Sequence, residues 1–102
     1  MKIIRCLAEK IEDELRDAES YIELAMTWKD EEPETAAVFD ELSREEMGHV
    51  DKLHADVARL ISEYRQEHGD PPKEMMALYN WLHEKHVSDA MRIKVKQGMF
   101  QA

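Results

Sequence analysis

The sequence has few of the residues that form the turns of strand-rich folds. Its 102 residues include only 3 Gly and 3 Pro, and 7% of them are aromatic. Sandwiches, barrels and doubly wound sheets need frequent turn formers, so this composition argues against all three. The sequence therefore predicts an all-α protein, and its length is that of one domain, residues 1–102.

Thiols, positive charge and long apolar runs are also scarce. Cys6 is the only cysteine, and residues 1–5 lack the apolar stretch of a secretory signal, so we expect a cytosolic protein, either free or inside a protein compartment. No apolar run reaches the roughly 20 residues of a membrane span, which predicts no membrane association. The net charge of −9 repels phosphate backbones and favours cations over nucleic acid as partners.

Two breaks divide the chain into three predicted helices. The first break, residues 30–33, ends in a proline, which suits the first turn of a new helix. The second, residues 69–72, is Gly-Asp-Pro-Pro, a helix stop followed by a stiff turn. The helices are expected at about 4–29, 34–68 and 73–96, and the short connections predict antiparallel neighbours.

Charge is distributed unevenly along the chain. Residues 1–70 are strongly acidic, whereas Lys and Arg outnumber Asp and Glu in residues 71–102. We expect the basic segment to dock on the acidic helices, and a solvated surface without specific meaning is the alternative.

Polar residues interrupt the apolar stripes of the first two predicted helices. Residues spaced by three and four define each stripe: Ile4, Leu7, Ile11, Ala18, Tyr21 and Ala25 in the first, and Phe39, Leu42, Val50, Leu53, Val57, Leu60 and Tyr64 in the second. Glu14 lies on the first stripe, Glu46 near the centre of the second, and His49 toward its edge. A carboxylate on a core-facing stripe is costly unless it is paired, protonated or bound to a metal.

These three residues are predicted to lie together. If residues 30–33 form a hairpin turn, Glu14 and Glu46 are about 17 and 15 residues from it, so they face one another. His49 follows Glu46 by one turn, which allows a carboxylate and an imidazole to share an ion. Carboxylate oxygens with one imidazole suit iron, or else manganese, better than structural zinc. Two alternatives remain: Glu19 in place of Glu14, and a metal-free dimer seam.

At these residues the sequence resembles the ferritin-like superfamily of bacterioferritins, rubrerythrins and encapsulated ferritins. The resemblance covers residues 7–64. In that family a ligand glutamate is followed seven residues later by a tyrosine, as Glu14 is by Tyr21, and the next helix carries Glu-x-x-His, here Glu46 to His49. The resemblance implies that Glu46 bridges two metals, that Glu14 and His49 each bind one, and that Tyr21 is a nearby phenol.

The chain supplies only half of such a site. A complete ferritin-like chain has four long helices and two half-sites, whereas the segment 73–96 contains no Glu-x-x-His. Encapsulated ferritins have about this length and pair two chains, so the resemblance implies at least a homodimer, with a four-helix bundle holding two irons at its interface. The implied function is ferroxidase-type oxidation of ferrous iron by oxygen or peroxide. The alternatives are a non-catalytic helical assembly module and a rubrerythrin-like peroxide-scavenging component.

Three of the four histidines outside this set can be placed relative to the apolar stripes. His86 falls on an apolar stripe of the third predicted helix and is interpreted as a core or interface histidine, with an accessory ligand as the alternative. His54 and His83 fall off their stripes and are expected to be solvated.

Overall fold

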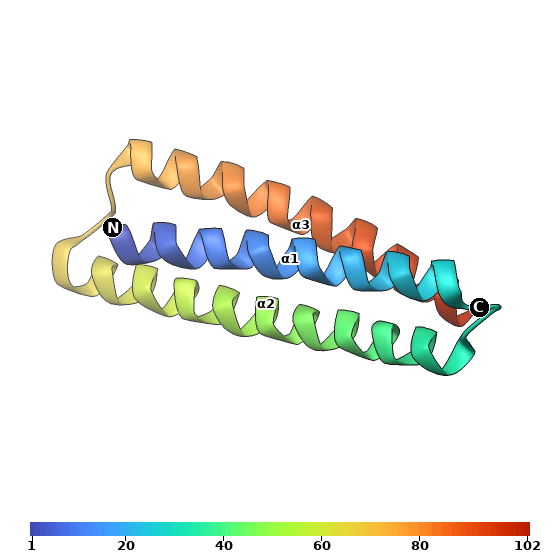
Figure 1. Ribbon diagram of the computed structural model, residues 1–102. Coiled ribbons are helices and arrows are strands. Elements are labelled where there is room, and N and C mark those ends of the chain that lie inside the picture. Colours follow the sequence, from blue (N-terminus) through green and yellow to red (C-terminus); the bar gives the residue numbers. More distant parts are fainter.

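The chain folds into three long helices (Figure 1). The computed structural model describes residues 1–102, and all of its regular secondary structure is helical. The helices are α1 (Lys2–Trp28), α2 (Pro33–His68) and α3 (Lys73–Gln101). α1 and α2 form an antiparallel hairpin, and α3 runs back beside α1 in the same direction as α1. The all-α prediction, the three-helix order and the antiparallel chain neighbours are confirmed.

Local sequence explains how α2 begins and ends. Pro33 is in its first turn, where the missing N–H costs no helical hydrogen bond. Gly69 terminates α2 with a φ of 78°, and its N–H donates to the carbonyl of Arg65 at 3.0 Å. A side chain at Gly69 would strain this backbone conformation, so glycine fixes the end of the helix.

The third helix is longer than its predicted range, 73–96. It continues to Gln101 because its last turns contact the hairpin. The ammonium of Lys29, just after α1, donates to the carbonyl of Phe100 at 2.6 Å and lies 5.2 Å from the centre of that ring. The side chain of Gln97 is buried and hydrogen bonds to Ser43. These tertiary contacts override the weak helix propensity of Gly98.

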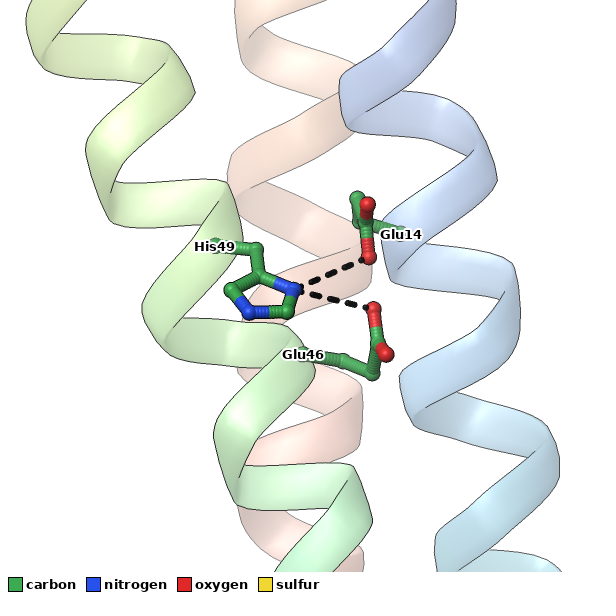
Figure 2. Close-up of side chains that lie close together, drawn as sticks. All are labelled: Glu14, Glu46 and His49. Carbon is green, nitrogen blue, oxygen red and sulfur yellow. Dashed lines mark hydrogen bonds and ion pairs between the residues drawn. The ribbon is translucent and has the colours of Figure 1, made fainter.

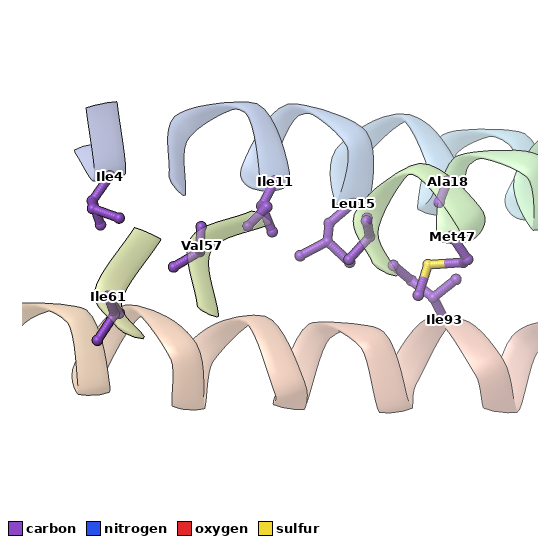
Figure 3. Close-up of a cluster of buried hydrophobic side chains, with 9 residues drawn as sticks. Ile4, Ile11, Leu15, Ala18, Met47, Val57, Ile61 and Ile93 are labelled. Carbon is purple, nitrogen blue, oxygen red and sulfur yellow. The ribbon is translucent and has the colours of Figure 1, made fainter. Parts of the chain in front are cut away.

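The side chains of the apolar core come mainly from α1 and α2, and α3 runs along one side of the cluster (Figure 3). Only one of its nine buried members, Ile93, comes from α3. The cluster consists of Ile4, Ile11, Leu15, Ala18, Met47, Val50, Val57, Ile61 and Ile93. The outer face of α3 instead carries four large apolar residues with exposed fractions of 58% to 64%: Trp81, Met91, Val95 and Met99. Helix α3 therefore contributes little to the core.

The α1–α2 hairpin has two long grooves, one on each side of the plane of its helices. α3 occupies one of them, here called the covered groove, which includes Glu12, Glu19, Ser43 and His54. The other, here called the open groove, includes Glu14, Tyr21, Leu42, Glu46 and His49. Nothing in the chain lies over the open groove, which leaves Tyr21, Leu42 and Glu46 only half-buried.

Candidate metal centre

Glu14, Glu46 and His49 meet in the open groove (Figure 2). α1 supplies Glu14, and successive turns of α2 supply Glu46 and His49. One ligand atom from each lies within 4.8 Å of the others. His49 Nδ1 is 3.5 Å from Glu14 Oε2 and 3.5 Å from Glu46 Oε2. The predicted proximity of the three residues is therefore confirmed.

The polar contacts inside the cluster are long. A distance of 3.5 Å exceeds that of a well-formed charge-assisted hydrogen bond. Glu46 Oε2 is inaccessible to solvent and has no hydrogen-bond partner. A buried carboxylate oxygen normally accepts at least one hydrogen bond, so this atom lacks its expected partner. Two carboxylates beside one imidazole leave uncompensated negative charge that a divalent cation would neutralise.

The cluster is accessible on its outer side. Exposure of the side chains rises from 18% at Glu46 to 27% at Glu14 and 53% at His49. Figure 2 shows the three side chains between α1 and α2, with α3 passing behind those helices. One chain therefore offers two carboxylates and one imidazole, fewer ligands than the four-helix di-metal carboxylate sites contain.

Tyr21 lies two turns along α1 from Glu14, on the same side of the helix. Its ring stacks on Phe39 of α2, with ring centres 6.3 Å apart and planes inclined by 25°. No hydrogen bond joins Tyr21 to Glu14, Glu46 or His49. The structure thus places Tyr21 in the open groove as an aromatic residue stacked on Phe39, with no hydrogen bond to the cluster.

Glu19, the alternative to Glu14, lies in the covered groove. Its carboxylate accepts hydrogen bonds from Arg92 at 2.7 and 3.0 Å and from Lys96 at 3.0 Å. These hydrogen bonds lower the pKa of Glu19 to about 2 despite partial burial, and hydrogen bonding by Arg92 has the largest effect. Both oxygens of Glu19 are satisfied within the chain, and the structure assigns the cluster to Glu14.

The same contacts confirm the predicted docking of the basic segment on an acidic helix. Lys85 pairs with Glu12 at 3.4 Å, and Lys96 pairs with Glu23 at 2.7 Å. With the contacts of Glu19, they form a line of ion pairs along α1 and α3. Opposite charges thus position α3 in the covered groove, which makes α3 a neighbour of the hairpin but not of the cluster.

The prediction for His54 is wrong. It is half-buried between α2 and α3, with its ring centre 5.4 Å from that of His83 and 5.8 Å from that of His86. His54 lies seven residues after Met47 and seven before Ile61, and both of those residues are buried. This spacing was the signal in the sequence that could have predicted the burial of His54. His83 is exposed as expected, and His86 is buried with only 3% of its side chain accessible.

Comparisons with known proteins give no match among protein-family models, curated proteins or solved structures. None of the three helices combines the length and apolar character that crossing a bilayer requires. Functional inference therefore depends on the geometry and chemistry of the residues themselves.

Proposed function

We propose that this protein is a ferritin-like ferroxidase whose di-iron site forms between two copies of the chain. The observation that carries the proposal is the convergence of Glu14, Glu46 and His49, with a buried oxygen of Glu46 that accepts no hydrogen bond. A divalent ion would supply a partner for that oxygen and neutralise both carboxylates. Two oxygen donors and one imidazole form a donor set that suits Fe²⁺, with Mn²⁺ as the second candidate.

The second copy completes the ligand set. Placing another hairpin against the open groove about a two-fold axis brings together two Glu14, two Glu46 and two His49 residues. That donor set is characteristic of di-iron carboxylate bundles, and the four helices of two hairpins form the bundle around it. Tyr21 and Leu42, half-buried in one chain, support the same arrangement because the second copy would cover them.

In this proposal ferrous iron is the substrate and the chain positions it. Two Fe²⁺ ions each lose one electron, and O₂ takes up both electrons and two protons to form H₂O₂. With H₂O₂ as the oxidant, the same two electrons and two protons give two molecules of water. The carboxylates of Glu14 and Glu46 favour the Fe³⁺ product because their negative charge stabilises the higher charge of the oxidised ion.

Anaerobic titration with Fe²⁺ tests the proposal. The parent protein should bind about one iron per chain and oxidise it in air, and iron should raise both the dimer fraction and the melting temperature. The Glu46→Ala, His49→Ala double variant should do none of these. A matched control, Glu45→Ala with His68→Ala, alters the same residue types at exposed positions outside the cluster and should behave as the parent does.

The same titration distinguishes the other functions. Equal melting curves with and without iron in parent and double variant, together with a stable dimer, would favour a non-catalytic assembly module instead. Faster iron oxidation by H₂O₂ than by O₂ would favour the rubrerythrin-like peroxide-scavenging role. A monomer that binds two irons per chain would contradict the shared site.

A further inference from the structure

A second cluster of metal-binding side chains lies in the covered groove. His54 comes from α2, while His83 and His86 come from adjacent turns of α3. The ring of His54 is within 6 Å of both partners, with centres 5.4 Å from His83 and 5.8 Å from His86. Glu12 of α1 approaches the same group, with its Oε1 3.7 Å from His86 Nε2. All three helices therefore contribute to this cluster.

Two ring nitrogens in the cluster lack partners. Nε2 of His54 and Nε2 of His86 are both inaccessible to solvent and accept or donate no hydrogen bond. The side chain of His86 is only 3% exposed, and the 3.7 Å separation from Glu12 is too long for a hydrogen bond. Buried polar nitrogens are rarely left unpaired, so two in one cluster indicate a missing common partner.

The ring centres are spaced nearly as an ion would require, although only Glu14, Glu46 and His49 already bring three ligand atoms within 4.8 Å of one another. Because a zinc–nitrogen bond is about 2.0–2.1 Å long, two imidazoles on one tetrahedral ion have ring centres about 5 Å apart. The separations from His54 are close to this value, and small side-chain rotations would close the difference. Burial lowers the pKa of His54 and of His86, which keeps both rings in the neutral form that binds metals.

We propose that His54, His83 and His86 form a second metal site, selective for a borderline divalent ion such as Zn²⁺ or Co²⁺. Its three imidazoles distinguish it from the carboxylate-rich cluster of the open groove, because nitrogen donors favour these ions. The carboxylate of Glu12 supplies negative charge that compensates the charge of the ion. Lys85 competes with the ion for this carboxylate, because its ammonium is 3.4 Å from the same oxygen. Because the ring of His83 is exposed, an ion can reach the site from solvent at this residue.

Such an ion would fasten α3 to the hairpin. His54 belongs to α2 and the other two histidines to α3, so bound metal links two helices that otherwise share few contacts. This site would stabilise the covered groove and does not depend on the proposed iron chemistry.

Titration with Co²⁺ in the Glu46→Ala, His49→Ala variant tests this site alone. Tetrahedral Co²⁺ has a visible absorption band, and we expect one Co²⁺ per chain, displaced by Zn²⁺, with a higher melting temperature. His83→Ala, a change at an exposed position, should weaken Co²⁺ binding by at least about tenfold. The control His68→Ala should leave binding unchanged.

The results separate the two metal sites. Loss of Fe²⁺ binding in the Glu46→Ala, His49→Ala variant with retention of the cobalt band would support both proposals. Absence of the cobalt band from the parent and the double variant, or equal Co²⁺ affinity with and without His83→Ala, would overturn this one. Circular dichroism of each variant checks that the helices remain intact.

Discussion

The two grooves of the hairpin differ in how completely the chain pairs their carboxylates. In the covered groove, Glu19 is paired with both Arg92 and Lys96, and the hydroxyl of Ser43 donates to the carbonyl of Ala18 at 2.7 Å. In the open groove, a buried oxygen of Glu46 accepts no hydrogen bond and Leu42 is half-buried. A single chain therefore pairs the carboxylates of the covered groove, although Nε2 of His54 and of His86 lack partners there, and leaves the carboxylates of the open groove without cationic partners.

The acidic residues of the two grooves also differ in the partners that they face. On the covered side, the acidic residues of α1 meet basic residues of α3, and the pairing is intramolecular. On the open side, Glu14 and Glu46 face each other with only His49 between them. Since a solvated ion pair contributes little and an unpaired buried carboxylate is costly, the open groove is where an external cation has most to stabilise.

The largest expected effect comes from the single core residue of α3. Ile93 is fully buried, so Ile93→Ala should lower the free energy of unfolding by about 2–5 kcal/mol through the cavity it leaves. Val95→Ala, at a position that is 62% exposed, should change it by less than about 0.5 kcal/mol. Urea denaturation of both variants measures the difference. Equal effects would mean that α3 is not anchored in the covered groove through Ile93.

A smaller effect, on assembly rather than folding, is expected in the open groove. Leu42→Asp should weaken the proposed dimer by about thirtyfold or more, about 2 kcal/mol, because it buries a charge at the interface. The exposed residue Val95 on the outer face of α3 serves as the control, and Val95→Asp should leave the dimer intact. Analytical ultracentrifugation across dilution measures both. Dissociation by Val95→Asp alone would place the interface on α3.

Much of the fold was predictable because α1 and α2 are each apolar on one side. The stripes that converge at residues 14, 46 and 49 overlap the observed core at Ile4, Ile11, Ala18, Val50 and Val57, so the proximity of the cluster followed from helical periodicity. The limits of α2 followed from Pro33 and Gly69. These are local signals, and they do not depend on knowing where α3 lies.

The contacts of α3 were harder to predict because its apolar residues surround the helix. Trp81 and Met91 are exposed while Ile93, on the predicted stripe of His86, is buried, and the large apolar residues off that stripe weaken its signal. The pairing of Glu19, the burial of His54 and the extension to Gln101 all depend on the docking of this helix. The pairing and the extension were hard to predict because α3 lacks one dominant apolar stripe, whereas the burial of His54 had a signal in α2, the seven-residue spacing from Met47 and Ile61.

The smallest expected effect concerns the ion pairs of the covered groove and their dependence on pH. Arg92 holds the pKa of Glu19 at about 2, below its ordinary value of 4.5, so the folded state favours the ionised carboxylate. This contribution is complete above about pH 4.5, shrinks as the pH falls toward 2, and vanishes below both pKa values. Glu19→Gln should therefore lower the melting temperature at pH 7, with a difference from the parent that narrows below pH 4.5. Exposed Glu45 supplies the control, because Glu45→Gln should show no such narrowing. A parent–variant difference in melting temperature that is constant from pH 7 to pH 3 would mean that the charge of Glu19 contributes nothing to the docking of α3.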